Sequence, residues 1–189
     1  MGQEDNKLIV KLKWGLDETK VNFVNKGLRL IESFSLNDIY LIRKDVDAKK
    51  MPNQQILENA IILRECLGNS PYRTLIYKDE NNLDSCCPVV DIDKTFDFML
   101  SIGYFEGFRI EQENLEYEIG DIKIFVEYVA DIGLFLEIEN NKSVEELINV
   151  LNDYEIAYYE DDFFVEKASL MLDKIKKGRW QYGRKESWN

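Results

Sequence analysis

The chain has 189 residues, a formal net charge of −12 and no histidine. Its hydrophobic content of 45% is that of a folded globular protein, and its length fits one domain with a hydrophobic core. The lack of histidine excludes Ser-His and Cys-His nucleophilic systems and histidine-based zinc sites. The acidic balance, with no basic run, predicts that the protein does not bind nucleic acid.

The sequence shows no targeting signal, membrane span or disulfide framework. The start MGQEDNK lacks the apolar core of a signal peptide, and no apolar run approaches the length of a membrane span. The cysteines, at positions 66, 86 and 87, are odd in number and badly spaced for a disulfide framework. We therefore expect a cytoplasmic protein that does not bind membranes.

Residues 7–14 alternate between basic and apolar side chains, which predicts a strand. Ile9, Lys11 and Lys13 share one face of it, because side chains alternate across a strand. An edge strand that is protected by lysines gives the same pattern and needs no ligand.

A helix, a strand and a polar stretch follow. Residues 17–25 predict a short helix, with Asp17 as the N-cap and Gly27 closing it. Residues 28–34 predict a strand. Residues 43–58 are polar, and we expect a loop there with at most one helical turn.

Two apolar segments, residues 60–65 and 73–78, predict neighbouring strands that carry Arg64 and Lys78. A guanidinium binds phosphate bidentately and an ammonium acts as a point charge, so both suit an anionic ligand. A basic residue on the solvent side of a strand is the simpler explanation of each. Residues 81–88, with two adjacent cysteines, are expected to form a loop.

The stretch 122–139 reads as a strand, a tight turn at residues 130–133 and a second strand. By alternation, the second strand has one apolar face and one face with two carboxylates. The residues of these faces are Leu134, Leu136 and Ile138, and Phe135, Glu137 and Glu139. Two carboxylates on one face repel each other unless a cation lies between them, and Mg²⁺ takes such hard oxygen ligands. The alternative is an amphipathic hairpin with its acidic face in solvent.

Helices are expected before and after this hairpin. Residues 91–100 predict one helix, and residues 144–153 predict another that begins with a capping box of Ser143 and Glu146. Residues 163–177 predict a C-terminal amphipathic helix. The basic and aromatic tail 178–189 suits a frayed end, or a surface for a base or a partner.

The hairpin resembles the late hairpin of the CYTH superfamily, the triphosphate-tunnel proteins that include class IV adenylate cyclases, thiamine triphosphatases and inorganic triphosphatases. The matching residues are Val126, Glu127, Ile132, Gly133, Phe135, Glu137 and Glu139. The family is similar in having Asp where this chain has Glu127. The resemblance implies an α+β fold: an eight-stranded antiparallel β-barrel with flanking helices, whose polar interior clamps a triphosphate and a metal.

Other motifs of the family occur in the same order along the chain, and their matching residues are Lys13, Asp38, Tyr40, Arg64, Lys78 and Tyr117. Two pairs depart from the pattern. Ile9 and Lys11 stand where the family's first strand has acids. Gln112 and Asn114, in the strand segment 107–117, stand where it has lysine and arginine. Each lost charge-assisted bond to phosphate is expected to weaken binding by about 1.5–3 kcal/mol.

The resemblance implies a single CYTH-like domain over residues 1–189 that binds a small-molecule triphosphate. The expected substrate-binding residues are Lys13, Arg64, Lys78, Gln112, Asn114 and Lys123. Glu127, Glu137 and Glu139 are expected to hold Mg²⁺ or Mn²⁺, with Glu137 and Glu139 as catalytic residues. Such a site hydrolyses a nucleoside, thiamine or inorganic triphosphate, or cyclises ATP. The alternative is a catalytically inactive anion-binding or scaffold module, and a homodimer is left open.

Overall fold

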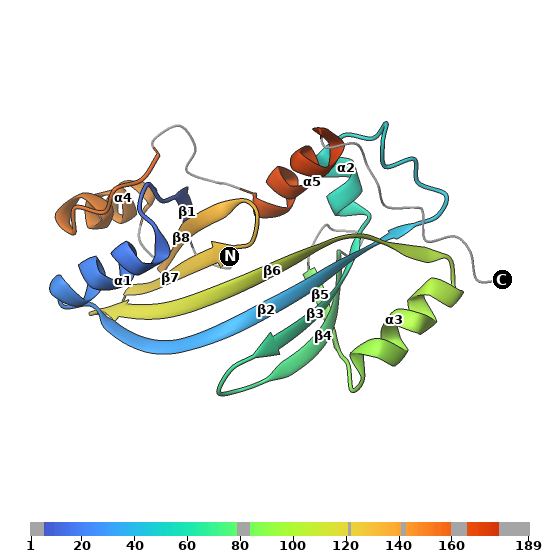
Figure 1. Ribbon diagram of the computed structural model, residues 1–189, viewed down its shortest axis with the longest axis horizontal. Helices are drawn as coiled ribbons and strands as arrows, with labels where there is room; N and C mark the ends of the chain where they lie inside the picture. The colour runs from blue at the N-terminus through green and yellow to red at the C-terminus, as the bar shows by residue number, and fades with distance from the viewer. Residues whose placement is uncertain (1–5, 79–83, 121, 141–142, 160–165, 178–189) are drawn as a thin grey trace. The chain divides into compact units, whose positions relative to one another are not determined.

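The computed structural model describes residues 6–78, 84–120, 122–140, 143–159 and 166–177, and at positions 6, 7, 78, 84, 139 and 140 only the backbone (Figure 1). The expected tail 178–189 lies outside these ranges. No helix within them is long and apolar enough to cross a membrane.

Strands within the described ranges form one sheet, in the order β1-β8-β7-β6-β2-β3-β4-β5. Their bounds are β1 Asn6–Lys11, β2 Arg29–Arg43, β3 Ile61–Leu67, β4 Tyr72–Lys78, β5 Asp84–Pro88, β6 Tyr104–Ile119, β7 Ile122–Val129 and β8 Gly133–Asn140. The predicted α+β fold with an eight-stranded antiparallel sheet is confirmed. The expected closure into a barrel is not seen in the described part of the chain, where β1 and β5 are the end strands of the sheet.

Five helices flank the sheet in the described ranges. They are α1 Leu16–Asn25, α2 Asn53–Glu58, α3 Ile92–Ser101, α4 Val144–Asp153 and α5 Lys167–Lys177. The helix expected at 144–153 has these bounds in the structure, and its capping box between Ser143 and Glu146 is present. The helix expected at 163–177 is described only from Lys167, and its first residues lie outside the described ranges.

The contacts divide the chain into two compact units. Unit 1 consists of Met1–Ser35 and Gln112–Glu166, and unit 2 of Leu36–Glu111 and Lys167–Asn189. Strands β2 and β6 contribute residues to both units, so neither unit is a continuous piece of sequence. A single domain over residues 1–189 stays a prediction.

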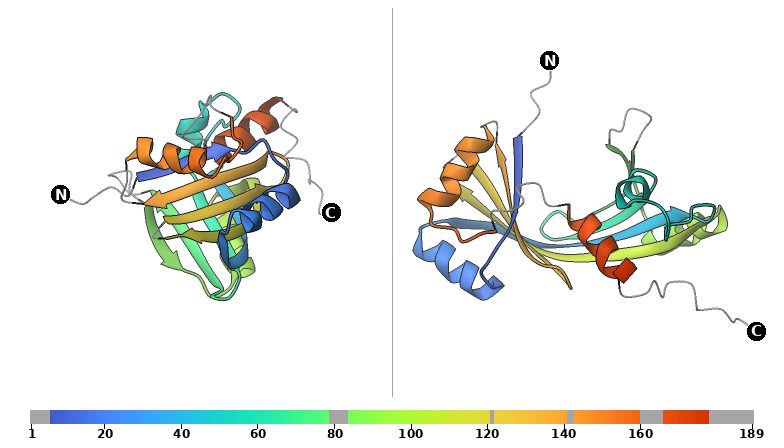
Figure 2. Two further views of the ribbon diagram at one scale, coloured as in Figure 1. Left: turned by 90° about the vertical axis from the view of Figure 1, so that its left-hand side faces the viewer. Right: turned by 90° about the horizontal axis from the view of Figure 1, so that it is seen from above.

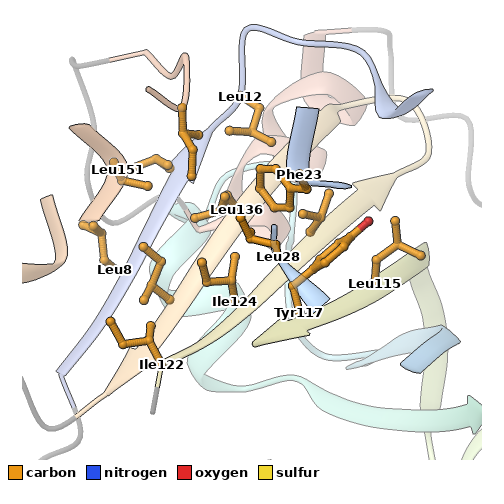
Figure 3. Packing of buried hydrophobic residues seen from close by; sticks show 14 of the residues in the cluster. Leu8, Leu12, Phe23, Leu28, Leu115, Tyr117, Ile122, Ile124, Leu136 and Leu151 are labelled. Atoms are coloured by element: carbon orange, nitrogen blue, oxygen red, sulfur yellow. The ribbon is translucent and has the colours of Figure 1, made fainter. Parts of the chain in front are cut away.

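In unit 1, one face of the strands β1, β8, β7 and β6 packs against α1 and α4 (Figure 2). The predicted apolar face of the hairpin belongs to this core, together with Phe23 of α1 and Leu147 and Leu151 of α4 (Figure 3). The ring of Phe23 meets Tyr117 edge to face, with 4.9 Å between the ring centroids. Because side chains alternate along a strand, the polar side chains of these strands lie on the face opposite this core.

The start of α1 differs from the sequence prediction. Gly15 is the N-cap, with an extended backbone, and Asp17 lies in the first turn. A carboxylate is favourable there too, because the amino end of a helix carries a partial positive charge. Gly27 closes the helix as predicted, in the left-handed conformation with φ of 80°.

In unit 2, a small core joins the sheet to α3. It contains Ile39 and Leu41 of β2, Leu63 of β3 and Met99 of α3. Asp91 caps α3 by accepting a hydrogen bond from the backbone N–H of Lys94.

Three local expectations were incomplete. The strand expected at 28–34 continues to Arg43, and the polar stretch 43–58 contains α2. The expected loop 81–88 contains β5, because its residues complete the ladder with β4.

The helix α2 packs against α5, where Asn53 donates a hydrogen bond to the carboxylate of Asp173 over 2.7 Å.

Candidate functional site

The strand register of unit 1 aligns polar side chains in rows across one face of the sheet. We call this the polar face, and its described members include Lys11, Gln112, Asn114, Glu116, Lys123, Phe125, Glu127, Phe135 and Glu137. One row runs from Asn114 on β6 through Glu127 on β7 and Phe135 on β8 to Lys11 on β1. The next row contains Glu116, Phe125 and Glu137.

Two carboxylates of the polar face are buried. Glu127 is 7% exposed and Glu137 is 6% exposed. Glu127 lies opposite Phe135, and Glu137 is two residues further along that strand, so the two acids are diagonal neighbours on paired strands. Glu137 is therefore buried, which differs from the alternative of an amphipathic hairpin with its acidic face in solvent.

These carboxylates have the right chemistry for a divalent cation. Mg²⁺ binds through one or two protein carboxylates and completes its shell with water and substrate phosphates. No group of three or more acidic or cysteine side chains converges on one point within the described residues. The side chain of Glu139, the third expected ligand, lies outside that description. Glu127 and Glu137 thus fit a two-carboxylate site.

Asn114 is the second informative residue of the polar face. It is 1% exposed and lies directly opposite Glu127 in the pairing of β6 with β7. Its Nδ2 has no hydrogen-bond partner among the described residues. A buried donor without an acceptor costs about 1–3 kcal/mol, so such a group calls for an explanation. An acceptor oxygen on a bound molecule would satisfy it.

Lys123 was expected to bind substrate, and the structure pairs it with a residue that the sequence reasoning did not single out. Its Nζ lies 3.0 Å from Glu116 on the neighbouring strand. The Lys123 side chain is 59% exposed and that of Glu116 is 15% exposed. The strict alternation of residues 112, 114 and 116 was the signal that could have identified Glu116.

Gln112 and Lys13 are the remaining residues of unit 1 that were expected to bind substrate. Gln112 is buried on β6, two residues before Asn114. Lys13 lies just past the end of β1 and is exposed, with its Nζ 5.5 Å from the centre of the Tyr159 ring.

Arg64 and Lys78 belong to unit 2. Arg64 donates from Nε and Nη2 to the two oxygens of Asp38, over 2.7 and 2.6 Å. Burial acts to lower the pKa of the Arg64 guanidinium, but the hydrogen bonds and charge of Asp38 outweigh it and raise that pKa above its usual value. The side chain of Lys78, at the end of β4, lies outside the described residues.

The described part of unit 2 also contains a cleft of about 390 Å³. Cys66, Tyr72 and Pro88 are among its lining residues. Burial raises the pKa of Tyr72, and the neighbouring guanidinium of Arg64 opposes this change. The cleft is mostly apolar, and the sequence patterns gave no sign of it.

Solved structures with the same fold exist at low sequence identity. PH1819 from Pyrococcus horikoshii OT3 is 21% identical, has a TM-score of 0.69, and is matched over 92% of this chain and 99% of its own. A protein of Vibrio parahaemolyticus named "putative adenylate cyclase" is 15% identical, with a TM-score of 0.62 over 92% of this chain and 99% of its own. HpAC1 from Hippeastrum, named a "putative adenylyl cyclase" with a dominant triphosphatase activity, is 8% identical, with a TM-score of 0.58 over 92% and 95%.

No protein-family model matches the sequence, and no curated protein matches it. The likeness to these structures spans nearly all of the chain and nearly all of theirs, but at such identities it shows the fold alone. The chain therefore has the same fold as these structures, two of which are named for adenylate cyclases, and this agrees with the resemblance of its motifs to the CYTH superfamily.

Proposed function

We propose that the protein binds a small-molecule triphosphate together with Mg²⁺ or Mn²⁺ and hydrolyses it. The observation that carries this proposal is the buried row of the polar face, where the unsatisfied Nδ2 of Asn114 lies opposite the carboxylate-bearing Glu127. Carboxylates bind a cation and an amide N–H binds an anionic oxygen. A metal–phosphate complex would therefore bind to the carboxylates through its cation and to the amide N–H through a phosphate oxygen.

In this proposal Glu127 and Glu137 hold the cation, with Glu139 as a further ligand. When bound, a divalent cation would neutralise the phosphate charge. This neutralisation is a main part of the catalysis of phosphoryl transfer. Asn114 donates from Nδ2 to a phosphate oxygen, and Gln112 provides a second amide in the same strand. Lys13 and Lys123 provide positive charge for the same ligand, and Arg64 and Lys78 of unit 2 stay predicted substrate-binding residues.

The names of two structural neighbours support a reaction of this class. HpAC1 is named for a triphosphatase activity and the Vibrio protein for adenylate cyclase. Hydrolysis needs a carboxylate that orients water, whereas cyclisation needs an oriented ribose hydroxyl. Glu137 and Glu139 are the residues that we assign to the orientation of water.

The test is phosphate release from tripolyphosphate, ATP and thiamine triphosphate with Mg²⁺ or Mn²⁺, beside an assay for cyclic AMP. We expect Glu137→Gln to keep the fold and to lose activity by more than the 10–100-fold that outer-shell partners of a metal typically cost. Glu113→Gln is the matched control, because Glu113 is an exposed residue on β6, next to Asn114 but with the opposite orientation. Equal turnover by the two variants would reject the metal assignment.

A second candidate is a module that binds the anion without turnover. Two observations favour it: Gln112 and Asn114 are neutral, and Arg64 is engaged by Asp38 through two of its nitrogen atoms. Silence in all four assays, with thermal stabilisation by tripolyphosphate retained, would establish this candidate instead.

A further inference from the structure

Lys11 is a cation of the polar face to which the proposed function gives no role. In the register of β1 with β8 it lies directly opposite Phe135, and Phe135 lies directly opposite Glu127. Lys11 therefore ends the row that begins with Asn114. It is half-buried, in contrast to the exposed Lys13 that follows the strand.

The side chain of Lys11 is held by shape and by an aromatic ring. Its Nζ lies 5.8 Å from the centre of the Phe135 ring, within the range of a cation–π interaction. A Cβ on Gly133 would lie 3.1 Å from Cε of Lys11 and 3.5 Å from its Nζ. Because glycine has no Cβ, the start of β8 leaves room for the end of the lysine side chain.

The Lys11 ammonium forms neither a hydrogen bond nor an ion pair with any other described residue. An aromatic ring offsets part of the charge but leaves the three N–H groups of an ammonium available. Lys13 lies two residues further along and likewise faces a ring, that of Tyr159. The Cα atoms of two residues at this separation are at most about 7 Å apart, so both ammonium groups can reach one linear polyphosphate.

We propose that Lys11 binds an oxygen of the polyphosphate chain and supplies part of the charge neutralisation that is otherwise left to the metal. This inference rests on the proposed function. It follows that Lys11 contributes most when no metal is present, since a divalent cation neutralises the same oxygens.

The test is isothermal titration of the full chain with tripolyphosphate, at fixed ionic strength, once in EDTA and once in Mg²⁺. Lys11→Met keeps the aliphatic stem over Phe135 and removes only the charge. We expect its Kd to rise by about 10–100-fold in EDTA, as for the loss of one charged hydrogen bond, and by less in Mg²⁺. Lys11→Arg, which keeps the charge, should restore binding.

Lys20→Met is the matched control, because Lys20 of α1 is another half-buried lysine of unit 1 and its removal changes the net charge equally. If Lys11→Met binds tripolyphosphate as the wild type does in both conditions, the role of Lys11 is overturned and the proposed function stands. If the wild type binds no tripolyphosphate in either condition, the proposed function falls and this inference falls with it.

Discussion

At the scale of single residues, the polar face carries groups that are expensive to bury. Glu127, Glu137 and Asn114 are all at most 7% exposed, and the Nδ2 of Asn114 is unsatisfied in the described residues. An unsatisfied buried donor reduces the stability of the free protein unless it is matched in a complex. Stability and binding are therefore expected to respond in opposite directions to substitution of Asn114.

Asn114→Leu tests this opposition. Leucine has a similar shape and no polar atom, so we expect the free energy of unfolding to rise by about 1–3 kcal/mol, the usual cost of a buried unsatisfied group. Stabilisation by tripolyphosphate with Mg²⁺ should fall in the same variant. Urea unfolding with and without ligand measures both effects. A variant that is less stable and binds equally well would contradict the assigned role of Asn114.

Arg64 is a residue whose sequence assignment was incomplete. The sequence marks it as a candidate phosphate ligand, but the structure gives it a carboxylate partner, Asp38, that is 1% exposed. A buried pair of this kind contributes little net stability, because the desolvation of both charges offsets their attraction. Its consequence is geometric: the bidentate contact fixes the plane of the guanidinium.

At the scale of elements, the hairpin β7–β8 and the helix α4 are linked through one core. The apolar face of the hairpin and the inner side of α4 meet in it, with Ile138 and Leu147 both fully buried. The helix has only ten residues, a length at which an isolated helix is marginal in water. Its capping box and this packing are therefore what stabilise it.

Ser143→Ala removes half of the capping box. The hydroxyl of Ser143 accepts a hydrogen bond from the backbone N–H of Glu146 over 3.3 Å, and the Glu146 carboxylate accepts one from the backbone N–H of Ser143. We expect a loss of about 1 kcal/mol in the free energy of unfolding, with faster amide exchange in the first turn of α4. Ser101→Ala, near the end of α3, serves as control, since the Ser101 hydroxyl donates to a backbone carbonyl and caps no N–H. Equal losses in the two variants would argue against the cap.

At the scale of the whole molecule, the two compact units share strands. Strands β2 and β6 each continue from one unit into the other, so unfolding of either unit leaves the part of each strand in the other unit with a free end. Backbone hydrogen bonds of a strand depend on its neighbours, and so the unfolding is cooperative.

Because the two units share strands, we expect the chain to unfold in one cooperative transition, and scanning calorimetry tests this expectation. A chain of 189 residues that unfolds as one unit should show an enthalpy on the order of 130 kcal/mol near 60 °C, equal to its van't Hoff enthalpy. Two independently unfolding units would give a van't Hoff enthalpy of about half the calorimetric value. That result would contradict the prediction of a single domain.

The sequence by itself determined what depends on local periodicity. The alternation in residues 134–138 assigned the side chains of this part of β8 to their faces, and the Ser143–Glu146 spacing identified the start of α4. The order of the motifs predicted the α+β fold with an eight-stranded antiparallel sheet, which the structure confirms. These features need only the period of a strand or helix and the chemistry of neighbouring residues, so a single chain read from end to end contains them.

Only the tertiary structure decided which side chains from distant segments meet. The pairing of Arg64 with Asp38, the unsatisfied amide of Asn114 and the space that Gly133 leaves for Lys11 all depend on which strands are neighbours and in which register. A shift of one residue in register would reverse the face of every side chain, and no local pattern specifies the partner strand. The physical reason is that contacts between distant segments are fixed by packing of the whole sheet, whereas alternation and capping are fixed within a few residues.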